Sequence, residues 1–316
     1  MDYMILDGHG LAYRAGHVLS LRSDSGKNTS VIFGLLNMIR SLLEEHLPKA
    51  VCICWDYEGS IAKEHLFPAY KIHRRTLDWD KPDDREKVLL AKEIKKQIND
   101  LYTVIPAFGM RQLRREGVEA DDIIGLLCDS LEGTILVVSS DKDLLQLVRP
   151  GVSVYYPPKD VTLDVLNFES NMGLNPALWL YYRCLTGDIS DGIPGLKGFG
   201  DVTAKRLLNQ FGEWNQWWTG DRIRVAVLEC CNKAQQRVLL SKEAKPLLER
   251  NYALMKLGYL VQEQKDWVLA EFRSQTIGFD EERIRQYFEE NQLTEYLTKF
   301  GIWIHSFRNL TRKRAM

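Results

Sequence analysis

Short runs of apolar, mostly β-branched residues alternate with longer amphipathic patterns through the first half of the chain. The short runs predict strands at residues 3–6, 50–55, 102–105, 134–139 and 152–156. Between them, apolar residues recur at helical spacing and predict helices at 31–45, 84–100 and 121–131. Because strands that alternate with helices usually pair in parallel, we predict an α/β fold with a mostly parallel sheet and helices on both faces.

The pattern changes near residue 160. Beyond this point the strand signals vanish, and helical patterns, glycine-rich turns and tryptophans take over. We therefore predict an α/β domain at 1–160 and a helical domain at 161–316. The aromatic residues after position 260 are expected to pack in a core rather than to stack on bases.

Composition excludes several classes of protein. The 316 residues are 45% hydrophobic and 27% charged, which is ordinary for a globular chain and excludes disorder as the main state. No apolar run approaches the ~18 residues of a membrane span, and the first residues lack the basic segment of a signal peptide, so we expect a cytoplasmic protein without membrane contact. The six cysteines show no CxxC spacing and are expected to be buried thiols in a reducing compartment, not zinc ligands.

Nine acidic residues lie at turns that follow predicted strands or flank glycines. Two of them end the first two strands, and the others lie in three short acidic segments. The nine are Asp7, Asp56, Glu119, Asp121, Asp122, Asp141, Asp143, Asp188 and Asp191. Because the carboxyl ends of parallel strands share one edge of a sheet, where ligands bind, we expect these side chains to gather in one region.

So many like charges in one region are costly unless cations compensate them. Carboxylate oxygens suit Mg²⁺, and Mn²⁺ as a substitute, and two such ions roughly 3.5–4 Å apart can activate water and stabilise the leaving oxygen in phosphodiester cleavage. Each acid taken alone has another explanation: a helix cap, the helix dipole or turn chemistry. All five segments together favour a shared metal site.

These acidic segments resemble those of the 5′-nucleases, a family that includes phage and bacterial 5′–3′ exonucleases, flap endonucleases and the nuclease domain of bacterial DNA polymerase I. The resemblance covers roughly residues 3–260. The matching segments are Gly117-Val-Glu-Ala-Asp-Asp122, Ser140-Asp-Lys-Asp143, Gly187-Asp-Ile-Ser-Asp-Gly-Ile-Pro-Gly195 and Gly198-Phe-Gly-Asp-Val-Thr-Ala-Lys205.

The resemblance implies two groups of metal ligands. A first carboxylate set would hold the catalytic metal and comprises Asp7, Asp56, Glu119, Asp121 and Asp122. A second carboxylate set would hold the second metal and comprises Asp141, Asp143, Asp188 and Asp191. On a regular helix Glu119 and Asp122 share a face while Asp121 points elsewhere, so the helix must begin near Ala120 if all three are to reach metal.

The family's fold is a PIN-like sheet with a helical arch over the active site, which would span about residues 68–100 here. Lys71 resembles the family's active-site lysine and Arg74 its partner at the scissile phosphate, while Tyr70 would stack on a base. The sequence departs from the family at two positions: His73 takes the place of an asparagine, and Lys63 that of an arginine seven residues after Asp56. These departures affect the arch, not the metal chemistry.

The glycine-rich pattern predicts a helix-hairpin-helix at residues 185–211. The resemblance implies that this hairpin holds duplex DNA through its phosphates. The residues expected to contact DNA in the arch and the hairpin are Tyr70, Lys71, Arg74, Arg75, Lys197, Gly198, Gly200, Lys205 and Arg206. By resemblance, main-chain carbonyls of the hairpin would hold a potassium ion, from Leu185, Thr186, Pro194, Leu196 and Phe199.

The net charge of −1 does not exclude a nucleic-acid partner. Setting aside the nine candidate ligands leaves a net charge of +8 on the rest of the chain, so the acids can be confined to one pocket beside a basic surface.

The resemblance implies a Mg²⁺-dependent, structure-specific 5′-nuclease that cleaves DNA at junctions of single and double strands. Its partners would be DNA with 5′ flaps, nicks or 5′ ends and RNA–DNA primers, and it would act as a monomer with a polymerase or ligase in trans. The hairpin and the full second carboxylate set argue against an RNA-cleaving PIN-type nuclease. The intact acids in all five segments disfavour a non-catalytic junction-binding protein. A haloacid-dehalogenase-type phosphatase is excluded because it needs a second aspartate where His9 stands.

Overall fold

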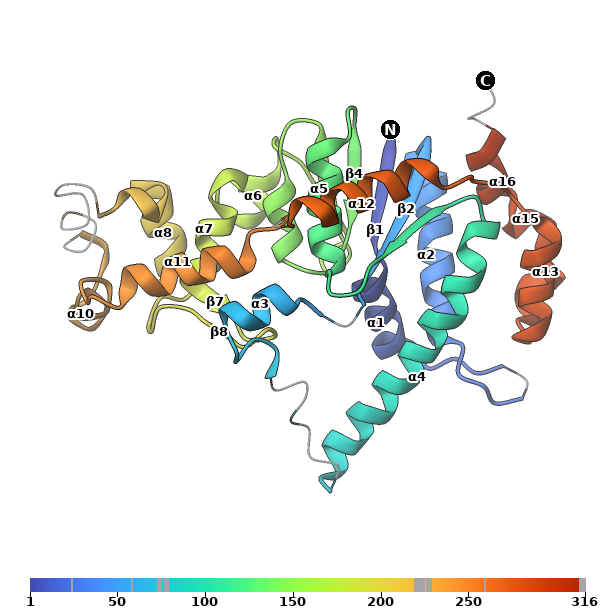
Figure 1. The fold of residues 1–316 in the computed structure, drawn as a ribbon, viewed down its shortest axis with the longest axis horizontal. Helices are drawn as coiled ribbons and strands as arrows, with labels where there is room; N and C mark the ends of the chain where they lie inside the picture. The colour runs from blue at the N-terminus through green and yellow to red at the C-terminus, as the bar shows by residue number, and fades with distance from the viewer. Residues whose placement is uncertain are drawn as a thin grey trace.

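A central six-stranded sheet organises the N-terminal half of the protein (Figure 1). The structure is a computed structural model that describes residues 1–23, 25–57, 59–72, 76, 80–218, 225, 229–258 and 260–312. The strand order is β3-β2-β1-β4-β5-β6, with every neighbouring pair parallel except β5 and β6. The strands are β1 (Tyr3–Asp7), β2 (Ala50–Trp55), β3 (Arg111–Arg114), β4 (Ile135–Val138), β5 (Val152–Tyr156) and β6 (Val161–Leu163).

Four of the five predicted strands are confirmed, and the one predicted at 102–105 is wrong. Residues 102–104 end helix α4 (Pro82–Val104), whose buried residues Ile94, Ile98 and Leu101 continue a helical period into this segment. The sheet's remaining parallel strand is instead β3, whose two terminal arginines are only half-buried. With two buried positions in four, β3 carries too little apolar signal to be found from the sequence.

Helices cover both faces of the sheet, as predicted. On one face, β1 residues Met4 and Leu6 join a core with α1 (Gly8–Val18), α2 (Ser30–His46) and α4. On the other face, Ile5 joins a second core with α5 (Ala120–Ser130) and the helices that follow the sheet. The alternation along β1 is that of a strand buried on both sides.

The remaining helices follow the sheet in the chain. They are α6 (Phe168–Met172), α7 (Trp179–Thr186), α8 (Asp201–Phe211), α10 (Lys233–Leu239), α11 (Ala244–Met255), α12 (Gln262–Ser274), α13 (Glu281–Glu290), α14 (Thr294–Thr298), α15 (Phe300–Trp303) and α16 (His305–Arg312). The last of them return to the first half of the molecule, where α13 packs on α4 and α16 packs on α2 (Figure 1).

The predicted boundary near residue 160 falls inside the sheet. Strand β6 extends the sheet to Leu163, and one continuous core joins α5 to α7, α8 and α11. Two-domain organisation therefore stays a prediction, with the α/β layer reaching slightly further along the chain than expected.

The predicted helix-hairpin-helix is present as α7, a two-stranded ribbon and α8. The ribbon pairs β7 (Gly187–Asp188) with β8 (Ile193–Pro194), and α7 packs against α8. The described parts of the predicted arch are the turn that follows α3 (Ile61–Leu66) and the long helix α4, which extends beyond the sheet (Figure 1).

The prediction that the six cysteines are buried thiols is confirmed: all six are free and buried. No helix among the described residues is both long and apolar enough to cross a membrane.

Candidate metal centre

Asp7 and Asp56 lie at the carboxyl ends of β1 and β2, on one edge of the sheet. Asp7 accepts a hydrogen bond from the backbone N–H of Gly10 at 2.9 Å, so it caps α1 as well as facing the site. Its second oxygen accepts from the Ser139 hydroxyl at 2.7 Å. Burial, and then the nearby charge of Asp56, raise the pKa of Asp7 to about 6.

The acids of the first carboxylate set on α5 converge as predicted. Helix α5 begins at Ala120, with Glu119 as the residue before it, so the helix start confirms the expected geometry. Ligand oxygens of Glu119, Asp121 and Asp122 all lie within 4.8 Å of one another. Asp56 contacts the start of the same helix, because its Oδ1 accepts from the Ala120 N–H at 2.7 Å.

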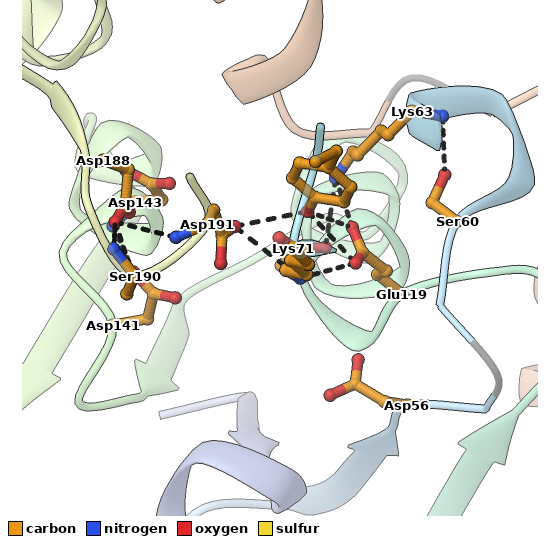
Figure 2. A network of polar contacts seen from close by, with 12 residues as sticks. Asp56, Ser60, Lys63, Lys71, Glu119, Asp141, Asp143, Asp188, Ser190 and Asp191 are labelled. Carbon is orange, nitrogen blue, oxygen red and sulfur yellow. Dashed lines mark hydrogen bonds and ion pairs between the residues drawn. The ribbon is translucent and has the colours of Figure 1, made fainter. Parts of the chain in front are cut away.

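A buried lysine lies among these three carboxylates. Lys63 Nζ is 2.7 Å from Glu119, 3.0 Å from Asp122 and 3.7 Å from Asp121, and the residue is only 7% exposed. Burial alone would raise the pKa of Glu119, but Lys63 and Lys71 outweigh it and hold that pKa at about 2. Lys63 thus supplies a counter-charge at the position where carboxylate oxygens converge (Figure 2).

Lys71 links the two carboxylate sets. Its Nζ lies 2.6 Å from Glu119 and 3.6 Å from Asp191, and its N–H donates to the Asp191 carbonyl at 2.8 Å (Figure 2). The backbone of Lys71 has φ +52°, a conformation that non-glycine residues rarely adopt and that clusters at functional sites. The lysine is therefore held at the centre of the site by both its side chain and its backbone.

The role predicted for Tyr70 must be corrected. Its ring is 3% exposed, so neither face is available to stack on a base. Its hydroxyl instead donates within 3.0–3.2 Å of Glu119 and Asp191. Tyr70 thus joins the two carboxylate sets from inside the protein.

The second carboxylate set is arranged differently. Asp141 accepts from the Asp143 N–H at 2.7 Å, and Asp188 accepts from the N–H and hydroxyl of Ser190 (Figure 2). Arg183 lies between Asp143 and Asp188 and donates to both at 2.5 Å. Burial raises the pKa of Asp143 to about 7, against the effect of the Arg183 charge. Among the described residues, the second set does not form a group of three converging ligand oxygens as the first set does.

Several predicted DNA contacts lie in the hairpin. Lys197, Gly198, Gly200 and Arg206 are exposed, whereas Lys205 is partly buried and pairs with Asp201 at 2.7 Å. The Arg206 guanidinium also donates to the Cys230 carbonyl. Arg74, Arg75 and His73 lie outside the described residues.

The carbonyls predicted to hold potassium lie in a tightly packed hairpin. A Cβ on Gly195 would lie 2.4 Å from the Leu185 carbonyl oxygen and 2.5 Å from that of Thr186. Leu185 accepts from the Leu196 N–H at 2.9 Å, and Pro194 accepts from Asn251 at 2.9 Å. The Leu196 carbonyl accepts from the Phe199 N–H at 3.0 Å. Each carbonyl has a second lone pair, so potassium binding stays a prediction.

The donors of both sets fit a hard divalent cation. All are carboxylate oxygens, the ligands that Mg²⁺ and Mn²⁺ prefer. Glu119, Asp122, Asp143 and Asp188 are buried, where unpaired charges would be costly. The buried cations Lys63 and Arg183 supply part of the compensation that such ligand sets require.

Comparison with known proteins identifies the family. The sequence model of the family described as "5'-3' exonuclease, N-terminal resolvase-like domain" matches residues 2–173, more than half of the chain. The chain belongs to the 5′–3′ exonuclease family of nucleases. The resemblance seen in the acidic motifs is thereby confirmed.

Curated relatives match about two thirds of the chain, and solved structures with a similar fold cover more of it. A 5′–3′ exonuclease of Streptomyces coelicolor is 33% identical over 66% of this chain and 72% of its own length. DNA polymerase I of Pseudomonas aeruginosa is 32% identical over 66% of this chain, which spans about a fifth of that protein (22%). The zinc-bound 5′-exonuclease of phage T5 has a similar fold, with a TM-score of 0.70 at 18% identity, covering 86% of this chain and 99% of the phage protein.

A second structure of the phage T5 protein, described as a flap endonuclease complexed with DNA and metal ions, gives a TM-score of 0.66. It is 18% identical, and the match covers 92% of this chain and 98% of that one. These likenesses confirm the fold predicted for a 5′–3′ exonuclease.

The sequence patterns did not predict three residues of the site. Lys63 was noted only as a departure from the family, although it lies in the centre of the first set. Ser139 and Arg183 gave no signal of their own. Ser139 bonds Asp7 and accepts from the Asp141 N–H at 2.9 Å, so it joins the two sets from the end of β4. The one available hint for Arg183 was its position five residues before Asp188, on the helix that leads into the acidic hairpin.

Proposed function

We propose that this protein is a Mg²⁺-dependent, structure-specific 5′-nuclease that hydrolyses DNA phosphodiesters at junctions of single and double strands. The observation that carries the proposal is the convergence of Glu119, Asp121 and Asp122 within 4.8 Å at the sheet edge of a 5′–3′ exonuclease fold. The phage T5 flap endonuclease, which has been described with DNA and metal ions, supports the choice of substrate.

The first carboxylate set would hold the catalytic ion, and Asp141, Asp143, Asp188 and Asp191 a second ion. When bound, the two ions supply a nucleophilic water at neutral pH and stabilise the leaving oxygen. The chain's own residues then orient the substrate. Lys71, which lies between the two sets, would leave Glu119 and contact the scissile phosphate, where negative charge develops in the transition state.

The hairpin would position the duplex part of the substrate. Gly198 and Gly200 allow a phosphate to approach the backbone before α8, and Lys197 adds positive charge beside them. A potassium ion held by the hairpin carbonyls would stabilise the same turn. If so, affinity for duplex DNA should be higher in KCl than in LiCl of equal ionic strength, and equal affinity would contradict this part of the proposal.

The decisive experiment uses end-labelled flap, nicked-duplex and single-stranded DNA with Mg²⁺, Ca²⁺ or EDTA. We expect cleavage near the junction with Mg²⁺, binding without cleavage with Ca²⁺, and no cleavage in EDTA. Asp121→Asn should abolish cleavage and leave flap binding intact, whereas the exposed Glu132→Gln, away from the site, should cleave normally. Cleavage in excess chelator, or loss of flap binding by Asp121→Asn, would contradict the proposal.

A further inference from the structure

The second carboxylate set contains a buried cation that belongs to the protein itself. Arg183 Nε donates to Asp143 and its Nη2 to Asp188, each at 2.5 Å, while Nη1 lies 3.3 Å from the Gly187 carbonyl. Arg183 is 9% exposed, and both aspartates are less exposed than that. The guanidinium therefore has acceptors from three residues and little contact with water.

These contacts occupy oxygens that a divalent cation would need. Two of the four carboxylates in the second set point one oxygen each at Arg183. Arginine stays protonated in proteins, so its charge cannot be removed by losing a proton. A cation that enters between Asp143 and Asp188 must therefore displace the guanidinium or bind beside a fixed positive charge.

The first carboxylate set lacks such a rigid contact. Its internal cations are the ammonium groups of Lys63 and Lys71, point charges on flexible stems, and three carboxylates already converge around Lys63. A metal ion that replaces the Lys63 ammonium finds its ligands in place. Arg183, in contrast, has a planar guanidinium on α7 whose donors are held by the carboxylates of Asp143 and Asp188 and by the backbone carbonyl of Gly187 on β7.

We propose that Arg183 is the internal counter-ion of the second carboxylate set and competes there with the second divalent cation. The inference rests on the proposed function, because it assumes that both sets bind metal. It follows that the two positions fill at well-separated concentrations, the first set before the second. Arg183 is thus a residue that sets metal affinity rather than a ligand or a catalytic residue.

The test measures metal binding rather than cleavage. Mn²⁺ is titrated into the full chain without DNA, and free Mn²⁺ is followed by electron paramagnetic resonance. The wild-type protein should show one tight and one weak site. Arg183→Gln removes the charge and should tighten the weak site by at least about tenfold, with the tight site unchanged. Arg149→Gln, which removes an ion pair with Asp129 from the other end of the sheet, should change neither site.

The sign of the effect decides the question. If Arg183 only held the ligands in position, Arg183→Gln would weaken the second site, and that result, or an unchanged site, would overturn the inference. Wild-type protein in which no Mn²⁺ binds tightly, and which does not cleave flap DNA, would instead contradict the proposed function. If the wild-type protein binds Mn²⁺ tightly and cleaves flap DNA, but Arg183→Gln leaves the second site unaltered, the inference about Arg183 is wrong while the proposed function stands.

A second measurement needs no variant and covers the case in which Arg183→Gln does not fold. The Nε–H resonance of Arg183 can be followed by nuclear magnetic resonance during a Mg²⁺ titration of the wild-type protein. Competition predicts that this resonance shifts only in the second binding step, when the guanidinium loses Asp143. A resonance that shifts fully in the first step, or stays constant to saturation, would refute the competition.

Discussion

Single residues in the site carry charges that are paired inside the protein rather than solvated. Lys63 is the clearest example, because its ammonium contacts three carboxylates and is almost fully buried. Breaking a buried pair by removing one partner leaves the other charge uncompensated, which is far more costly than losing an exposed pair.

Lys63→Met should therefore lower the free energy of unfolding of the metal-free protein by about 3–5 kcal/mol. Urea unfolding in EDTA measures this change. Lys205→Met is the control, since Lys205 pairs with the exposed Asp201 and should change stability by less than about 1 kcal/mol. Added Mg²⁺ should recover part of the loss in Lys63→Met by replacing the missing charge. Equal stability of the two variants would show that Lys63 does not compensate the carboxylates.

The raised pKa of Asp7 gives the metal-free protein a defined dependence on pH. Because the folded state holds this proton up to pH about 6, against an ordinary value of 3.8, its stabilising effect is complete below pH 3.8 and is lost as pH rises through 6. In EDTA, the free energy of unfolding should thus fall by about 1 kcal/mol between pH 5 and 7.5 from this group. Asp7→Asn should lack that part of the decrease; an identical pH profile for both proteins would argue against the shift.

At the scale of elements, the hairpin between α7 and α8 is held by backbone packing. Gly195 lies so close to the Leu185 and Thr186 carbonyls that any side chain would force the two segments apart. We expect Gly195→Ala to lower the free energy of unfolding by about 1–3 kcal/mol or more. Gly200→Ala is the matched control, because its Cβ would meet nothing within 4 Å. Thermal unfolding compares them, and a Gly195→Ala protein as stable as the control would contradict the close packing.

The arch and the hairpin should differ in what they contribute to cleavage. Lys71 acts in our proposal on the transition state, so Lys71→Ala should lower the saturated single-turnover rate far more than duplex affinity. Lys197→Ala with Lys205→Ala should instead weaken duplex binding and reduce the salt dependence by roughly 0.9 in slope per lost phosphate contact. Rate-versus-enzyme curves at two salt concentrations separate the effects. If Lys71→Ala changes only the affinity for duplex DNA, the proposed separation of roles between Lys71 and the hairpin lysines is wrong.

Across the whole molecule, the C-terminal helices complete the core of the N-terminal half. Trp303 is 6% exposed, packs against Phe108 and Phe307, and donates to Asn37 on α2 at 3.1 Å. The expectation that these aromatic residues form a core is thereby confirmed for Trp303. The second half of the chain thus stabilises the sheet that carries the site.

Trp303→Ala should accordingly destabilise the protein by about 3–5 kcal/mol, while the neighbouring Ile302→Ala, at an exposed position, should change stability by less than about 0.5 kcal/mol. Urea unfolding gives both values. Because Trp303 lies away from the carboxylates, the folded fraction of Trp303→Ala should cleave flap DNA at the wild-type rate. A stable variant, or a folded one with altered cleavage, would contradict a purely structural role.

The sequence by itself determined the sheet class, most strands and the nine acids, because these follow from local signals. A buried strand needs an apolar run, and a carboxylate that ends a strand reaches a known edge of the sheet. The prediction that α5 begins near Ala120 combined helical geometry with the set of metal ligands that the family resemblance implied. Strand β3 escaped prediction because a short strand with half-buried ends has almost no local pattern.

Only the tertiary structure decided how the charges of the site are compensated. Lys63 is 56 residues from Glu119 in the chain and Arg183 is 40 residues from Asp143, and no local pattern encodes such pairs. The same holds for Tyr70, whose aromatic ring suggested stacking but whose burial turned its hydroxyl towards Glu119. The energy of a buried charge depends on every group around it, and that environment exists only once the chain has folded.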